Sequence, residues 1–210
     1  QKSTSISYEY YGTYNRTITL AYNANSGSST PTKQTATQWY HSLLGASSNT
    51  FTLAGAISRT GYTFTGWLHG STTGTSYGAG TKITINADTT MYANWQLNKY
   101  TVTLAGSNVT YQNTGGTGIS SIDVYYGKTA QFKVVPKTGY YFQSISCTNG
   151  YTIAGFATGT SAYSTQTLTI TNPSVLSGAT CTITMHLRNY AATATRVQKT
   201  CWGEKCGDPY

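Results

Sequence analysis

The chain has 210 residues, which is room for one large or two small domains, because domains cluster at about 100 to 150 residues. Only 9% of the residues are charged, against about a quarter in ordinary globular proteins, so the net charge of +8 lies on a polar and mostly uncharged surface. With 19 Tyr, 22 Gly and 13% aromatic residues, the composition excludes an all-helical protein and argues against a disordered one.

The first half of the chain begins with a polar, tyrosine-rich arm over residues 1–16, either an extra strand or a loose lead. From Thr17, the alternation of Ile18, Leu20 and Tyr22 predicts a half-buried strand. Residues 33–44 give the only helix that we predict, a short one that carries Thr throughout. Further strands are predicted at 50–53, 62–68, 82–85 and 91–95, separated by Gly, Ser and Asn turns.

The second half begins where the pattern resets at residues 96–99, since residues 100–104 repeat the strand type seen at 17–20. Strands are predicted at 100–104, 121–125, 129–135, 141–147, 167–171 and 180–187. Both halves carry a Gly-Tyr-x-Phe segment, at 61–64 and 139–142, which is a weak internal repeat. We therefore expect a mostly β chain with two small domains in tandem, at 17–97 and 98–188, followed by a tail over 189–210.

The four cysteines lack C-x-x-C spacing and a matching histidine cluster, so disulfides and an oxidising, extracellular location are expected. Sequence alone leaves three connectivities open. No stretch approaches the roughly 20 apolar residues of a membrane span, and residues 1–7 lack the basic-then-apolar order of a signal peptide. We expect a mature and soluble chain.

Three segments in the first half occur in a specific order and spacing: RTGYTFTGW at 59–67, YGAG at 77–80 and DTTMYANW at 88–95. Over about residues 17–96 they resemble the Listeria-Bacteroides, or internalin B-type, repeat. The resemblance implies a small β-grasp-like module of bacterial surface proteins with one short helix. The WYH segment at 39–41 departs from the plainest repeats.

Residues 99–188 resemble, more loosely, divergent bacterial surface repeats, through PKTGYYF at 136–142, SCTNG at 146–150 and TCT at 180–182. This resemblance implies a β-sandwich-like or β-grasp-like domain in which Cys147 and Cys181 are partners. The prediction that follows pairs Cys201 with Cys206 in a small loop of the tail.

Reactive side chains are few and scattered. The five acids form no pair suited to general acid–base work, and the three histidines lack metal-ligand spacing. No nucleophile elbow or phosphate-binding loop occurs. We therefore expect a protein that is not an enzyme and binds no cofactor or metal. The acids are Glu9, Asp88, Asp123, Glu204 and Asp208, and the histidines are His41, His69 and His186.

The remaining functional signal is tyrosine, which stacks on sugars and packs across protein interfaces at low entropic cost. Filling cross-strand positions is the more common role of tyrosine in small sheets. The candidate ligand or interface contacts are Tyr8, Tyr10, Tyr11 and Tyr14 in one cluster and Tyr125 and Tyr126 in a second.

We interpret the chain as a bacterial cell-surface or secreted protein that acts as a stalk, an adhesive module or a subunit of a pilus or fibre. The alternative is a module that binds carbohydrate or cell-wall polymers through exposed tyrosines. Other surface-protein subunits, copies of the same chain and glycans are the expected partners. Nucleic acid ranks below glycans, because the basic residues are dispersed rather than arranged in a stripe.

Overall fold

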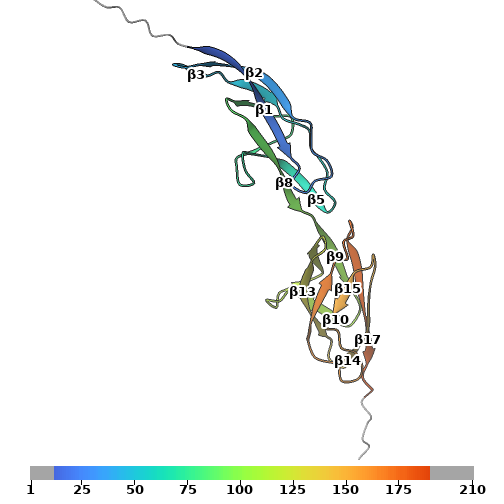
Figure 1. The fold of residues 1–210 in the computed structure, drawn as a ribbon. Coiled ribbons are helices and arrows are strands. Elements are labelled where there is room, and N and C mark those ends of the chain that lie inside the picture. The colour runs from blue at the N-terminus through green and yellow to red at the C-terminus, as the bar shows by residue number, and fades with distance from the viewer. Residues whose placement is uncertain (1–11, 190–210) are drawn as a thin grey trace, which may run out of the picture.

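The computed structural model of the chain describes residues 12–189. Within that range every regular element is a β-strand, and the strands form four sheets (Figure 1). The predicted mostly β class is confirmed. Because residues 12–189 contain no helix, they also contain none long enough to cross a membrane.

The first unit consists of strands β1 to β8 and is built around a six-stranded sheet. In sheet order the strands are β3 (Gly45–Ala46), β2 (Gln34–His41), β1 (Thr13–Asn23), β8 (Thr89–Leu97), β5 (Tyr62–His69) and β6 (Ser76–Tyr77). A second, two-stranded sheet pairs β4 (Asn49–Thr52) with β7 (Lys82–Ile85). The predicted alternation in β1 buries Ile18, Leu20 and Tyr22, which join Trp67 and Met91 in one hydrophobic cluster.

The helix predicted at residues 33–44 is wrong, because this segment forms strand β2. Thr35 and Thr37 are β-branched and alternate with Ala36 and Gln38, a pattern that suits a pleated strand. The segment pairs antiparallel with β1, for example Ala36 opposite Ile18. Pairing with a buried neighbour therefore outweighs the weak helix preference of this sequence.

The second unit is a sandwich of two sheets, with strands β9 to β17. One sheet has the order β12 (Ser121–Tyr125), β9 (Lys99–Ala105), β17 (Ala179–Leu187) and β14 (Tyr140–Cys147). The other has the order β11 (Gly118–Ile119), β10 (Val109–Gln112), β13 (Thr129–Pro136), β16 (Gln166–Thr171) and β15 (Thr152–Ala154). Side chains of both sheets, with Phe132 and Phe142 among the largest, fill the space between them.

The two units contain the same four-stranded arrangement. The order β2-β1-β8-β5 in the first unit corresponds to β12-β9-β17-β14 in the second, and in each the two central strands are parallel. In both, the register shifts by one residue directly after the Gly-Tyr-x-Phe segment, following Phe64 and Phe142. The repeated sequence segment thus marks a repeated bulge.

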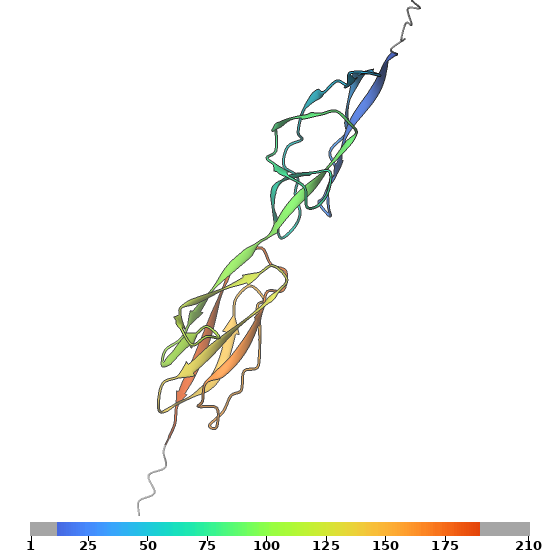
Figure 2. The same ribbon diagram turned by 90° about the vertical axis from the view of Figure 1, so that its left-hand side faces the viewer.

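The units lie end to end, as two views at right angles show (Figures 1 and 2). Strand β8 of the first unit leads into β9 of the second through the single residue Asn98. The two hydrophobic clusters share no residue. Residue 12 and residue 189 therefore stand at opposite ends of an elongated molecule (Figure 1).

A disulfide joins Cys147 to Cys181, the pair that the resemblance implied. These residues lie directly opposite each other on β14 and β17, and Cys181 is buried in the sandwich. The bond closes a loop with a sequence separation of 34. Cys201 and Cys206, the second predicted pair, lie outside the described residues.

Reduction of the Cys147–Cys181 bond is expected to destabilise the second unit by about 3 to 4 kcal/mol, because it frees the unfolded chain from a long loop. The first unit contains no cysteine and serves as an internal control. Hydrogen exchange followed by mass spectrometry, with and without reductant, should show lost protection confined to residues 99–187. Equal loss in both units would contradict this expectation.

Candidate interface sites

Asn98, the residue between the two units, makes hydrogen bonds to both of them. Its backbone N–H donates to the carbonyl of Gly61 (2.9 Å), and its side-chain Oδ1 accepts from the Thr63 hydroxyl (2.6 Å). Its own carbonyl accepts the backbone N–H of Tyr126 in the second unit (2.9 Å). We call this region, with Gly61 and Tyr126, the junction.

Tyr126 and Gly61 are in direct contact across the junction. A Cβ atom placed on Gly61 would lie 2.2 Å from Cδ1 of the Tyr126 ring, well inside the distance that real Cβ atoms show. Gly61 also has a φ of +79°, a conformation that disfavours other residues. Only glycine therefore satisfies both the turn before β5 and the close approach of the ring.

Tyr125, the neighbour of Tyr126, faces outwards and is 48% exposed. It borders a hollow of about 280 Å³ formed by residues 96–100. Nearby, the Lys99 ammonium pairs with the Asp123 carboxylate at 2.6 Å, and the Thr101 hydroxyl donates to the same carboxylate. These hydrogen bonds, with that from Lys99 the stronger, lower the pKa of Asp123. The hollow is thus lined by an exposed ring and by Lys99, whose charge is compensated by Asp123 outside it.

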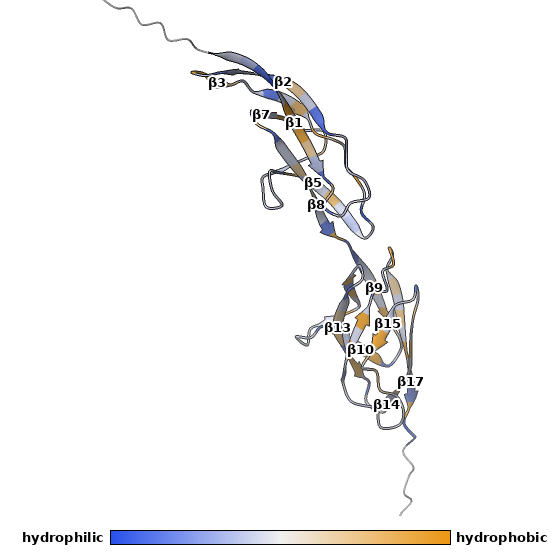
Figure 3. Ribbon diagram, viewed as in Figure 1, coloured by the Kyte–Doolittle hydropathy of each residue, from blue (hydrophilic) through white to orange (hydrophobic). Residues whose placement is uncertain are grey.

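The end of the first unit farthest from the junction carries exposed apolar side chains; we call it the tip. Its members are the exposed Tyr14, Trp39, Leu43 and Leu44 and the half-buried Tyr40, from β1, β2 and the turn before β3. Trp39 is 60% and Leu44 is 81% exposed. The Tyr14 and Tyr40 rings contact each other at a centroid distance of 4.9 Å. Figure 3 shows the apolar colour of the β2–β3 turn.

A buried polar network holds the base of the tip. Gln38 is fully buried, and its side-chain amide donates to the carbonyls of Ser47 and Asn86, both at 2.6 Å. Its oxygen accepts from the Arg16 guanidinium. Because every polar atom of this glutamine has a partner, the network fixes β2 at the point where it leaves the core.

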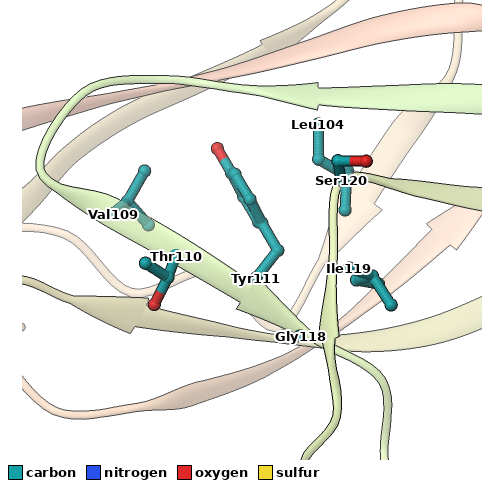
Figure 4. Close-up of a pocket in the computed structure, with 7 residues that line it drawn as sticks. All are labelled: Leu104, Val109, Thr110, Tyr111, Gly118, Ile119 and Ser120. Atoms are coloured by element: carbon teal, nitrogen blue, oxygen red, sulfur yellow. The ribbon is translucent and has the colours of Figure 1, made fainter.

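A hollow of about 620 Å³ lies in the second unit, at the edge between its two sheets. The ring of Tyr111 projects into it from β10 (Figure 4). The Tyr111 hydroxyl donates to the carbonyl of Ala105, and burial raises the pKa of Tyr111 to about 12. The lining contains no ionised group and offers no acid, base or metal ligand. It consists of Leu104, Val109, Thr110, Tyr111, Gly118, Ile119 and Ser120.

The sequence singled out six tyrosines, and the structure describes three of them. Tyr126 lies in the junction, Tyr125 beside the hollow next to it, and Tyr14 at the tip. Tyr8, Tyr10 and Tyr11 lie outside the described residues. Sequence reasoning missed Trp39, Leu43 and Leu44, because it placed them in a helix, where an apolar face would be buried. The departure of the WYH segment from plain repeats was the signal that pointed to them.

Acids and histidines do not gather in any one place within residues 12–189. No group of three or more His, Cys, Asp or Glu that could hold a metal ion occurs there. Asp88 accepts the backbone N–H of Thr19 (2.8 Å), while Asp123 pairs with Lys99 in the other unit. Each of these two carboxylates is thus engaged in a local structural contact.

Comparison with known protein families finds a match to part of the chain. Residues 17–94 match the sequence model of the Listeria-Bacteroides repeat domain. This match supports the resemblance predicted for the first part of the chain, and it does not extend to the second unit. No curated protein and no solved structure matches the chain.

The glycines at 61 and 139 provide a matched test of the junction. Both have positive φ, +79° and +91°, but in the described part of the chain nothing except its chain neighbours lies within 4 Å of a Cβ placed on Gly139. Substituting either by Ala should cost its own unit about 1 to 2 kcal/mol through backbone strain. Gly61→Ala alone must also displace Tyr126.

We therefore expect amide exchange at Asn98 and Tyr126 to accelerate at least about tenfold in Gly61→Ala and to stay unchanged in Gly139→Ala. NMR-detected hydrogen exchange measures both amides. Equal exchange rates in the two variants would show that the ring contact contributes nothing to the junction.

Burial of Tyr111 predicts that the stability of the second unit depends on pH. Its phenol has an ordinary pKa of 10.0 and a folded pKa of about 12. The unfolded chain loses this proton first, so the stability that neutral Tyr111 contributes is complete below pH 10 and is lost as the pH rises through 12. Between pH 9 and 12, the free energy of unfolding measured with urea should fall less steeply in Tyr111→Phe than in the wild type. Parallel curves would contradict this assignment.

Proposed function

We propose that the described part of the chain is a rigid spacer of a bacterial cell-surface or secreted protein, with no catalytic activity of its own. The observation that carries the proposal is the junction, where one residue connects the units and a tyrosine from the second unit covers a glycine of the first. The match of residues 17–94 to a bacterial surface repeat supports the setting.

Several restraints act on the short connection between the two units. Domains joined by small polar contacts move relative to one another by default. Here the linker is a single residue whose N–H, carbonyl and side chain are all engaged. Each such hydrogen bond contributes about 1 kcal/mol, and the Tyr126 ring on Gly61 opposes bending on that side. We infer two separately folding units, 17–97 and 98–188, that move as one body.

An extracellular location is part of the proposal. The Cys147–Cys181 disulfide supports it, because disulfides persist in oxidising compartments and are rare in reducing ones. Low charge with many hydroxyl side chains gives a surface that is polar without strong attraction to nucleic acid. A spacer of this kind holds whatever adjoins its two ends a fixed distance apart.

The proposal is tested by residual dipolar couplings, which give each unit its own alignment tensor. The wild type should give the same tensor for both units. Tyr126→Ala should give two different tensors, because the cover over Gly61 is gone while both cores stay intact. Tyr163→Ala, which removes a half-exposed ring at the far end of the second unit, is the matched control and should behave as the wild type. Different tensors in the wild type would refute a rigid spacer.

Adhesion to glycans or cell-wall polymers is the second candidate. Its supporting observation is Tyr125, an exposed ring beside a hollow of about 280 Å³. A glycan array with the wild type and Tyr125→Ala tests it: binding that the substitution abolishes supports adhesion, and the absence of binding to any glycan removes this candidate.

A further inference from the structure

The far end of the second unit repeats the backbone geometry that the first unit shows at the junction. We call this end the exit. The carbonyl of Gly139 accepts the N–H of Arg188 at 2.7 Å, as the carbonyl of Gly61 accepts that of Asn98 at 2.9 Å. Tyr140 stands opposite Leu187, as Tyr62 stands opposite Leu97. The backbone at the exit therefore repeats the hydrogen bond and the strand pairing at which the first unit receives its neighbour.

The two copies differ in what covers them. The Tyr126 ring stands over Gly61, whereas within residues 12–189 nothing beyond its own chain neighbours lies within 4 Å of a Cβ placed on Gly139. Leu97 is half-buried at the junction, while Leu187 is 55% exposed at the exit. The positive φ of Gly139 accounts for a glycine there. This φ angle does not explain why Leu187, which lies beside Gly139, leaves apolar area exposed to water.

Exposed apolar side chains gather at the two ends of the molecule. Among residues 12–189, eight large hydrophobic side chains are exposed. Four of them belong to the tip, and two, Tyr163 and Leu187, lie at the exit, where the Arg188 guanidinium stacks on the Tyr163 ring at 3.9 Å. The four at the tip are Tyr14, Trp39, Leu43 and Leu44.

We propose that the tip of a second copy of this chain docks on the exit, with an aromatic ring of the tip covering Gly139 as Tyr126 covers Gly61. The inference goes beyond the spacer function and does not depend on it. The tip supplies the required aromatic rings, and the exit supplies the same turn and glycine that receive a ring inside the chain. Tip and exit are different surfaces, so the contact is heterologous and builds an open, head-to-tail row of molecules.

The contact is small on both sides and therefore weak. Only a few apolar side chains are exposed at each end, whereas a stable interface buries roughly 800 Å² per partner. Association should therefore appear only at high protein concentration or where copies are held close together. A few aromatic and leucine side chains near the centre should account for most of its free energy.

The test uses two variants of the full chain that each block one end. Trp39→Ser with Leu44→Ser blocks the tip, and Tyr163→Ser with Leu187→Ser blocks the exit; all four side chains are exposed, so folding is preserved. Leu176→Ser, another exposed leucine that belongs to neither end, is the control. Sedimentation equilibrium over a wide concentration range measures association, and circular dichroism checks the fold.

The wild type and the Leu176→Ser control should form a concentration-dependent series of oligomers. Each blocked variant alone should associate at least about tenfold more weakly. A mixture of the two blocked variants should form dimers and nothing larger, because it contains one intact tip and one intact exit per pair. A wild type that stays monomeric, blocked variants that associate normally, or an exit-blocked variant that still dimerises through its tips would each overturn the proposal.

Discussion

The arrangement of the molecule depends on the contact between the Tyr126 ring and Gly61. Strand β8 passes into β9 through one residue, and such a connection alone would allow the units to swivel. The ring fills the space that any side chain at position 61 would occupy, and the N–H of Tyr126 is bonded to the carbonyl of Asn98. Gly61 is therefore needed both for the turn before β5 in the first unit and for the contact with Tyr126 of the second unit.

The shared four-stranded arrangement is stabilised differently in the two units. In the first unit, rings pack edge to face, with Tyr22 against Trp67 and Phe64 against Trp95. When the strands of the two units are aligned by register, Cys147 and Cys181 occupy the positions of His69 and Met91. The second unit therefore has a disulfide where the first has this pair of side chains. The second unit also adds a five-stranded sheet that covers its core. The same backbone plan thus tolerates two means of closing its core.

Much of the fold follows from local sequence. The alternation of Ile18, Leu20 and Tyr22 predicts β1 because a period of two places all three on one face. The helix predicted at 33–44 fails because the partner strand, not the local sequence, decides that segment. Gly-Tyr-x-Phe recurs in both units, yet nothing in the motif indicates that one glycine is covered by a tyrosine 65 positions later.

The candidate sites were partly visible in the sequence. Tyr125 and Tyr126 stand out as a pair, but pattern alone gives no means to tell that one faces water and the other the first unit. The direction in which each ring points depends on the turn after β12 and on which end of the sandwich lies next to Asn98. The tip could not be predicted for a related reason. Local sequence does not distinguish an exposed tryptophan at the end of a hairpin from a tryptophan buried in a core.

The central claim, that the junction makes two units into one rigid body, is tested most directly by backbone ¹⁵N relaxation of the wild-type chain. A rigid molecule predicts that amides of both units report one anisotropic rotational diffusion tensor, with its long axis along the line from tip to exit. Two separate tensors, each with the shorter correlation time of a single small domain, would contradict the account.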